Sequence, residues 1–315
     1  MRDFLRNKKI DFVGNLKKYL IVLAAIILVG AIISVVFGVK LDINFKGGSR
    51  YTYSFNGDID LATAQNVANK SIGSTSAVAS ISTDVTGQNK NLVISIPAGN
   101  TDNTASDTIL KALKTQYPGS NFALADANTV GASIAGTFLL KSVVAILIAA
   151  ILVIVYIGIR FRLIGGISAG VTALVALVVD IVVAFMACVI FRLEIDSNFI
   201  AVVLTILGYS LNDTVVIYDR IREEKKLRPG ESVRNIVNSS INNTLGRTVA
   251  TSVATLLAVL TVLVVSEFFG LNTLRSFAIP MSAGIISGAF SSICLSGPLW
   301  VLWCEKFPKK SKAKR

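Results

Sequence analysis

The chain has 315 residues, of which 53% are hydrophobic and only 16% are charged. Ordinary soluble domains carry about 25% charged residues, so this composition argues against a water-soluble protein. The chain contains no histidine, which excludes histidine metal sites, Ser-His-Asp triads and a histidine proton relay. The net charge is +12, but Lys and Arg cluster beside apolar runs rather than on a polar face, so we expect no nucleic-acid partner.

The cysteines do not indicate a redox or metal function. Cys188, Cys294 and Cys304 all lie within apolar runs, and no C-x-x-C spacing occurs. We therefore expect them to be packing residues. No catalytic constellation is visible, so we expect no enzyme activity, no metal and no cofactor, with protons as the coupling ion of any transport chemistry.

Six apolar segments are long enough to cross a hydrocarbon core, which needs about 20 helical residues. The first segment is longer than the apolar region of a signal peptide and lacks a good cleavage site, so we expect it to remain as an anchor. The predicted spans are 19–39, 139–159, 164–191, 198–217, 247–268 and 275–303; the last five belong to a membrane region 138–304 that includes a loop at 218–246.

Residues 40–137, between the first two spans, show the pattern of a folded domain of their own. Strand-like and helix-like segments alternate in the order β-α-β-β-α-β, which is typical of the ferredoxin-like split motif. The domain lacks cysteine, a Gly-rich phosphate loop and a convergent acid pair, so its role is mechanical or in recognition, and the two remain open. The predicted elements are strand 49–55, helix 60–72 with Asp60 as N-cap, strands 77–83 and 92–97, helix 105–117 and strand 121–127.

The distribution of Lys and Arg predicts the orientation, since cytoplasmic loops carry the excess. Twenty lie in the N-terminal tail 1–18, the turn after the second span, the loop 218–246 and the C-terminal tail, against two in the short outer loops. Both termini are thus predicted to be cytoplasmic and residues 40–137 external. Contact with anionic lipid explains the basic tail 305–315, although binding to RNA or ribosomes is the alternative.

Three charged residues are predicted at membrane depth, where charges are rare and mark ion pathways or pair with one another. They are Asp180 in the third span, Asp213 in the fourth and Arg247 at the start of the fifth. Asp213 and Arg247 are expected at similar depth on antiparallel helices, where an ion pair that opens when Asp213 binds a proton would act as a switch. The alternative is that Arg247 reaches the interface and Asp213 caps the end of its helix.

Small polar residues accompany both charges and predict a hydrated or hydrogen-bonded stripe inside the bundle. Residues of this kind are also the ordinary glue of membrane helix packing, so the stripe alone does not establish a pathway. The residues are Tyr209, Ser210, Asn212 and Thr214 beside Asp213, and Thr248, Thr251 and Ser252 after Arg247.

Three segments, Leu41–Ser49, Gly208–Glu223 and Asn238–Leu257, resemble the SecF family of protein-export subunits, part of the resistance-nodulation-division superfamily. The six-span order with a large first external loop matches as well. The resemblance implies a SecD-like partner, association with the SecYEG channel, an unfolded preprotein as substrate and use of the proton-motive force. It further implies that Asp213 and Arg247 take part in proton passage.

The external-turn motif of the first segment comprises Asp42, Phe45, Gly47 and Gly48. The chain departs from the family's pattern at Asn44, where a second Asp is common, which favours a turn-forming role over a metal or proton role. A second departure is Val179, where relatives often have His before the Asp of the third span. Asp180 is therefore either part of the proton pathway or a packing residue.

Two functions of different classes remain open from the sequence. The first is a proton-coupled transport subunit that acts on unfolded polypeptide. The second is a non-conducting scaffold of the translocon, in which the intramembrane charges serve assembly. A small-molecule efflux half-transporter is less favoured, because the external domain is small and has few aromatic residues for a drug pocket.

Overall fold

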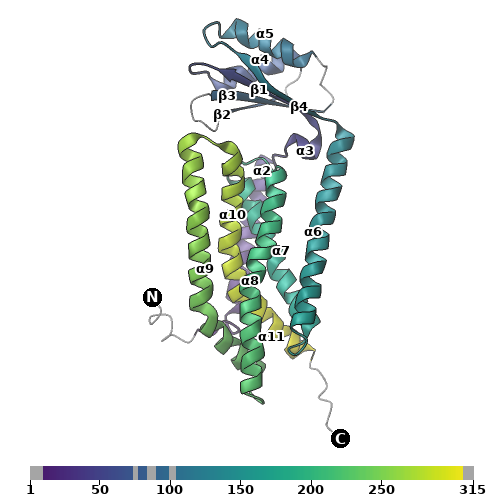
Figure 1. The fold of residues 1–315 in the computed structure, drawn as a ribbon, viewed down its shortest axis with the longest axis vertical. Coiled ribbons are helices and arrows are strands. Elements are labelled where there is room, and N and C mark those ends of the chain that lie inside the picture. Colours follow the sequence, from purple (N-terminus) through teal and green to yellow (C-terminus); the bar gives the residue numbers. More distant parts are fainter. Residues whose placement is uncertain (1–9, 74–76, 84–89, 99–103, 308–315) are drawn as a thin grey trace.

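The computed structural model describes residues 10–73, 77–83, 90–98 and 104–307. It shows an α-helical bundle with a small α+β domain at one end, and the start of α2 and the end of α11 lie at the opposite end of the bundle (Figure 1). Six helical spans in the described part are long and apolar enough to cross a membrane. The predicted fold class is therefore confirmed.

The six spans form a tall bundle in which the last span is the most buried. Five of them are single helices, and the sixth is built from three consecutive helical pieces. The spans are α2 (Leu16–Phe37), α6 (Ala132–Arg160), α7 (Gly166–Ile190), α8 (Ser197–Leu227), α9 (Val233–Phe269) and the succession α10 (Asn272–Ser291), η1 (Ser292–Ser296) and α11 (Gly297–Lys306).

Helices α8 and α9 are much longer than the spans predicted from hydropathy. At 31 and 37 residues they extend to about 46 and 55 Å, against a hydrocarbon core of about 30 Å. Most of the predicted loop 218–246 is thus helical. Its α8 part is polar and is held by ion pairs one turn apart, from Glu224 to Arg220 at 2.7 Å and to Arg228 at 2.6 Å.

The sixth span changes direction near its C-terminal end. A π-helix, η1, interrupts it, and Pro298 lies in the first turn of α11. Both features disturb the regular hydrogen-bond ladder, and π-helical turns often occur at functional sites. Figure 1 shows α11 running at an angle beneath the bundle.

The external domain has the predicted β-α-β-β-α-β order. Its four strands form one antiparallel sheet in the order β2-β3-β1-β4, and helices α4 and α5 cover the face away from the membrane bundle (Figure 1). Asp60 caps α4 as predicted, by accepting the Thr63 backbone N–H at 2.9 Å. The elements are β1 (Gly48–Phe55), α4 (Leu61–Ile72), β2 (Val78–Thr83), β3 (Lys90–Pro97), α5 (Ala105–Gln116) and β4 (Ala123–Val130).

The domain has a hydrophobic core of its own between the sheet and the two helices. Tyr53, Ile94 and Leu92 from the strands pack against Ile109 and Leu113 of α5, and all five are fully buried. The Tyr53 hydroxyl donates to the Ser106 carbonyl at 3.0 Å, so the buried polar atom of this ring has a partner. The sheet is thereby a rigid platform directly above the bundle.

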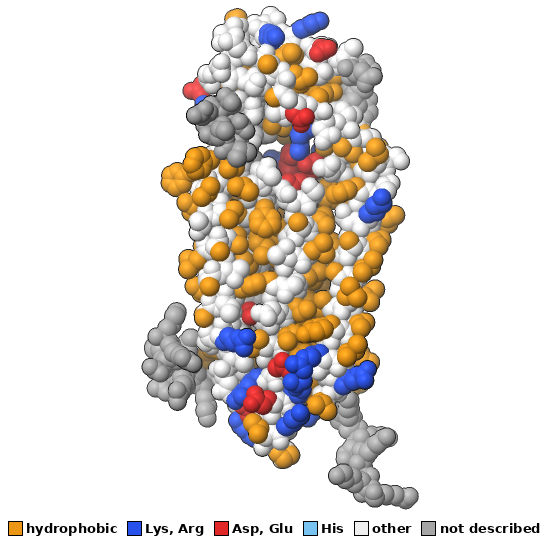
Figure 2. All heavy atoms as spheres, in the orientation of Figure 1, with side chains coloured by type: hydrophobic (Ala, Val, Ile, Leu, Met, Phe, Trp, Pro, Cys, Tyr) orange, Lys and Arg blue, Asp and Glu red, His pale blue; other side chains and the backbone are white. Residues whose placement is uncertain are grey.

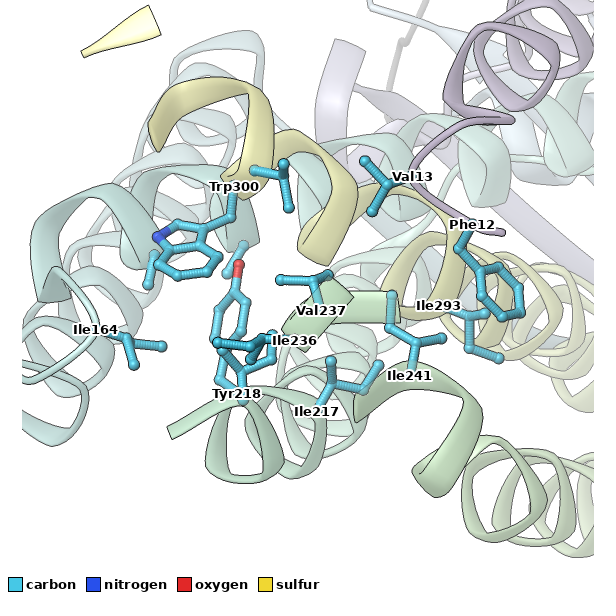
Figure 3. Close-up of a cluster of buried hydrophobic side chains, with 14 of the residues drawn as sticks. Phe12, Val13, Ile164, Ile217, Tyr218, Ile236, Val237, Ile241, Ile293 and Trp300 are labelled. Atoms are coloured by element: carbon cyan, nitrogen blue, oxygen red, sulfur yellow. The ribbon is translucent and has the colours of Figure 1, made fainter. Parts of the chain in front are cut away.

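The N-terminal segment before α2 folds back onto the end of the bundle opposite the external domain. Phe12 and Val13 are buried in a cluster that includes Tyr218 of α8, Ile241 of α9 and Trp300 of α11. Figure 3 shows these side chains turned towards one another. The predicted N-terminal tail is thus partly packed, from residue 10 onwards.

Two asparagines of α9 hold this segment by its backbone. Asn242 accepts from Ile10 N at 3.0 Å and donates to the Ile10 carbonyl at 2.9 Å. Asn238, one turn earlier, accepts from Val13 N and donates to Asp11 at 2.7 Å. Hydrogen bonds from Gly14 N and from Asn238 lower the pKa of the Asp11 carboxyl.

Charge is distributed along the long axis of the molecule. In Figure 2, Lys and Arg side chains gather at the end of the bundle opposite the external domain, while apolar side chains cover its middle. Asp and Glu side chains gather where the external domain meets the bundle. The apolar belt and the basic end agree with a membrane protein whose basic end faces the cytoplasm.

Candidate functional site

Asp213 lies inside the bundle on α8, about 24 Å along the helix from Ser197. The residue is only 3% exposed. Its carboxylate accepts hydrogen bonds from Ser252 Oγ at 3.3 Å and from Thr251 Oγ1 at 3.5 Å, both on α9. The structure thus places the predicted α8 carboxylate against the predicted α9 hydroxyls, through long and adjustable contacts.

Arg247 and Asp213 do not form the expected ion pair, and no ion pair of Arg247 occurs in the described part of the chain. The arginine side chain is exposed. Arg247 precedes Thr251 by one helical turn, about 6 Å, so its Cα lies farther from the external domain than the hydroxyls that reach Asp213. Arg247 and Thr251 lie four residues apart and are therefore on the same face of α9.

The alternative of a helix cap is wrong for Asp213, because α8 continues to Leu227. Arg247 does not begin its helix either, since α9 starts at Val233. The hydropathy pattern marked only the apolar half of α9, which placed Arg247 at an apparent helix start. Both residues lie well within continuous helices.

Asp180 is fully buried and is the centre of a second polar cluster. It accepts hydrogen bonds from Ser210 of α8 at 2.7 Å and from Ser287 and Ser291 of α10 at 2.7 and 2.9 Å. One carboxylate on α7 therefore ties together three helices. Ser287 and Ser291 were not among the predicted residues, although their spacing of four residues puts them on one helix face.

Further hydroxyls extend this cluster along α8 and η1, away from the external domain. Thr214 and Ser292 share a hydrogen bond of 3.0 Å, and Ser292 also donates to the Ser210 carbonyl at 3.3 Å. Lower down, the fully buried Tyr218 hydroxyl lies 2.9 Å from the Thr172 hydroxyl of α7. Ser210 and Thr214 thus face α10 and η1, whereas Asp213 faces α9.

The other predicted supporting residues differ in position. The Tyr209 hydroxyl and the Thr248 hydroxyl are buried and have no hydrogen-bond partner among the described residues. Asn212 is exposed, so the structure does not bring it into the site. The polar stripe predicted from the sequence is therefore divided between the Asp213 site, the Asp180 cluster and the bundle surface.

The external-turn motif forms a short helix, α3 (Ile43–Lys46), between α2 and β1. Asp42 caps this helix by accepting the Asn44 backbone N–H at 3.0 Å. Gly47 and Gly48 follow with φ of +76° and +136°. These residues shape the turn of the backbone. This agrees with the turn-forming role that Asn44, in place of a second Asp, favours.

No group of three or more Cys, Asp or Glu side chains that could hold a metal ion occurs among the residues that the structure describes. Cys188 and Cys294 are free thiols buried among apolar side chains, and Cys304 is half-buried. The chemistry of the site is thus that of carboxylates, hydroxyls and one arginine.

These features define a multi-pass membrane protein with buried carboxylates in its bundle and a ferredoxin-like domain outside it. The profile of the family described as "Protein export membrane protein SecD/SecF, C-terminal" matches residues 109–306. The chain belongs to this SecD/SecF family.

Relatives from several organisms agree with this assignment. The chain is 33% identical to the protein translocase subunit SecF of Alicyclobacillus acidocaldarius over 96% of both chains. It is 31% identical to the protein translocase subunit SecDF of Bacillus subtilis, matching with 97% of its own length and 40% of that relative's. In the second case the chain corresponds to less than half of a longer protein.

A solved structure shows the same arrangement of elements. The crystal structure of SecDF from Thermus thermophilus superposes with a TM-score of 0.79 and 27% sequence identity. The match covers 95% of the present chain and 39% of the SecDF chain. The fold is therefore shared with one part of a larger membrane protein.

Proposed function

We propose that the chain is a SecF-like subunit of the Sec protein-export machinery that uses the proton-motive force, with a SecD-like partner, to promote preprotein translocation. The observation that carries the proposal is the site on α8 and α9. The buried carboxylate of Asp213 accepts two long hydrogen bonds, from Thr251 and Ser252 of α9. The exposed Arg247 lies one turn before Thr251 on the same helix. This site provides a proton acceptor, Asp213, and a positive charge, Arg247, whose attraction to Asp213 depends on whether Asp213 is protonated.

The proposed switch follows from the two protonation states of Asp213. When the carboxylate is ionised, it accepts from Thr251 and Ser252 and attracts the Arg247 guanidinium. When it is protonated, it loses that attraction and donates one hydrogen bond itself. Because the three partners are all on α9, protonation would change how α8 and α9 pack. Asp180 serves this pathway by holding Ser210 and α10 in place.

The proposed partners follow from the relatives and from the surface. In Bacillus subtilis, SecF-like and SecD sequence are joined in one SecDF protein, so a SecD-like subunit is proposed to complete the bundle here. Charged residues at membrane depth need surrounding protein, since lipid does not solvate them. The SecYEG channel, unfolded preprotein and membrane lipid are the further proposed partners.

The Asp180 cluster favours a second candidate function, a non-conducting scaffold of the translocon. Its three short hydrogen bonds from two neighbouring helices support a role of this intramembrane charge in assembly. If the same held for Asp213, the chain would support export without proton passage. A dependence on the gradient separates the two candidates.

Export from membrane vesicles with and without an imposed pH gradient tests the proposed function. Vesicles that contain the chain and its SecD-like partner are expected to export more preprotein when the gradient is imposed. Vesicles that lack the chain should show a smaller gradient effect. Equal gradient stimulation in both kinds of vesicle would contradict the proposal and favour the second candidate, a non-conducting scaffold.

We further propose that the chain lies in the cytoplasmic membrane with both termini in the cytoplasm and residues 40–137 external. A reporter fused after Arg315 is then expected to be cytoplasmic, and one inserted near Asn89 external. The reason is that twenty Lys and Arg lie in the predicted cytoplasmic segments and only two in the short outer loops. Accessibility of each reporter to a membrane-impermeant reagent measures this. The opposite pattern would overturn the orientation.

A further inference from the structure

Three segments that are distant in the sequence meet beneath the external domain. They are the linker after α2, the start of β1 and the loop between α7 and α8. Asp42 N donates to the Ile195 carbonyl at 3.1 Å, and Ile195 N donates to the Lys40 carbonyl at 2.9 Å. Leu41 and Ile195 form an isolated parallel bridge. The linker and the loop are thus joined by their backbones.

Arg50 of β1 joins the external sheet to both of these segments. Its Nη2 atom donates to Asp42 Oδ2 at 2.8 Å and to Glu194 Oε2 at 3.0 Å. The Asp42 side chain is almost completely buried, and those of Arg50 and Glu194 are 29% and 36% exposed. Charge-assisted bonds of this length in a partly dry site are among the stronger hydrogen bonds in proteins.

The position of Arg50 is fixed by the backbone on either side. Gly48 starts β1 at φ +136°, and a Cβ atom there would lie 2.1 Å from the Ile96 carbonyl oxygen. Arg50 itself is paired with Ser95 of β3 and Asn128 of β4. A side chain other than glycine at position 48 would force β1 and β3 apart. Their close approach thus keeps Arg50 above the place where the linker and the α7–α8 loop are joined, which we call the joint.

The short helix α3 anchors the same joint in the bundle. Phe45 of α3 belongs to the hydrophobic cluster at the outer ends of α7 and α8, with Phe199 among its members. Its ring lies edge-on to Phe138 of α6, with centroids 5.3 Å apart. The joint is therefore attached to the bundle by the apolar packing of Phe45, and to the sheet by the ion pairs of Arg50.

The joint continues into the helices that carry the functional site. Asp196, two residues after Glu194, caps α8 by accepting the Asn198 and Phe199 backbone N–H groups. It also accepts from Ser276 of α10 at 3.1 Å. Burial raises the pKa of Asp196, although these hydrogen bonds oppose the shift. The loop that Arg50 contacts through Glu194 thus leads directly into α8.

We propose that Arg50 is a positioning residue that fixes the external domain on the outer ends of α7 and α8, so that the domain and the helix bearing Asp213 move as one body. Breaking its contact with Glu194 removes the link between the sheet and the α7–α8 loop, so that the sheet can tilt relative to the bundle, while the bundle stays assembled. The first of two tests does not depend on the proposed function. The second uses gradient-stimulated export and does.

The first test measures the distance between the domain and the bundle in the full chain in lipid. Spin labels at Lys114→Cys on α5 and Phe268→Cys on α9 are placed in a background with the native cysteines replaced by alanine. A single narrow distance distribution is expected, and Arg50→Met or Glu194→Ala should broaden it. Glu194→Ala leaves the external domain itself unaltered. An unchanged distribution in both variants would overturn the proposal.

Lys90→Met is the matched control for this measurement. Lys90 pairs with Asp58 in the same domain, away from the joint. The loss of this pair removes a cation and an ion pair but does not touch the attachment, so the distribution is expected to stay narrow. Broadening by Lys90→Met equal to that by Arg50→Met would also count against a specific role of Arg50.

The second test restores the attachment chemically in Arg50→Cys/Glu194→Cys. Without reagent, gradient stimulation should fall by about fivefold or more, the low end of coupling between two sites. A short thiol-to-thiol cross-linker should restore most of it, whereas the single-cysteine variants should not recover. Normal stimulation without the reagent, or no recovery after cross-linking, would overturn the proposal. If the parent chain shows no gradient stimulation at all, the proposed function fails and the distance measurement alone decides the role of Arg50.

Discussion

Asp213→Asn is expected to abolish gradient-stimulated export while the membrane complex accumulates normally. The amide has nearly the same size as the carboxyl group, and the hydroxyls of Thr251 and Ser252 contact the two different oxygens of the carboxylate. In Asn the remaining oxygen accepts from one of these hydroxyls, and the NH2 group donates to the oxygen of the other. The amide does not bind or release a proton at physiological pH, so the proposed switch is lost and the packing is kept. Export from vesicles with and without an imposed gradient, measured beside the amount of complex, gives both quantities.

The Arg247 variants extend this expectation. Arg247→Lys keeps the positive charge but loses the planar fork that grips a carboxylate, so it should impair gradient stimulation less than Arg247→Met. Asn212→Ala is the matched control, because Asn212 neighbours Asp213 in sequence but is exposed on the bundle surface. Normal accumulation together with normal stimulation in Asp213→Asn would refute the proton switch.

A structural ion pair predicts a different pattern from these variants. Removal of one partner of a buried pair leaves the other charge uncompensated, at a cost of about 3–5 kcal/mol in soluble proteins. Loss of complex would then accompany every loss of export. The exposure of Arg247 and the absence of an ion pair with Asp213 favour the first pattern, in which assembly and coupling separate.

The membrane topology was predictable because apolar length and basic flanks are local properties of the sequence. The full lengths of α8 and α9 were not, since hydropathy detects only the part of a helix that lies in lipid. Outside the lipid, α8 is stabilised by the ion pairs of Glu224 with Arg220 and Arg228. Their spacing of four residues is a helix signal, which was present in the sequence but was attributed to a loop.

The residues of the site were easier to predict than their contacts. Asp213 and its α9 hydroxyls were expected together from the antiparallel arrangement of adjacent spans. The ion pair with Arg247 was expected from similar depth alone, and depth along a helix does not decide where a long, exposed side chain points. Contacts between distant segments, such as Arg50 with Glu194, have no local signal at all.

Asp180 shows how a rare buried charge can be found from sequence while its role depends on its neighbours. Charged residues at membrane depth are conspicuous, and Asp180 was recognised as one. Its function as an acceptor for Ser210, Ser287 and Ser291 became evident only when α7, α8 and α10 were placed side by side. Of the three serines only Ser210 was among the predicted residues, as a neighbour of Asp213, and here it donates to Asp180 instead.

Asp180→Leu is expected to reduce the amount of folded chain strongly, because it leaves three buried serine hydroxyls without their acceptor. Each hydroxyl that finds no other partner costs about 1–3 kcal/mol. Ser291 has an alternative in the Gly288 carbonyl at 3.3 Å, so the loss falls mainly on Ser210 and Ser287. Accumulation in the membrane and the thermal unfolding midpoint in detergent measure the effect, and Val178→Leu, at an exposed position of α7, is the control.

Asp180→Asn separates the two roles that the sequence left open for this residue. The amide oxygen still accepts from serine hydroxyls, and the amide N–H groups can donate to a serine oxygen, so the three helices should remain tied together. If Asp180 is a packing centre that supports the Asp213 site, this variant accumulates normally and keeps most of its gradient-stimulated export. If it accumulates normally but loses stimulation as completely as Asp213→Asn, the Asp180 carboxyl must itself carry a proton, and the assignment of Asp180 as a supporting residue is wrong.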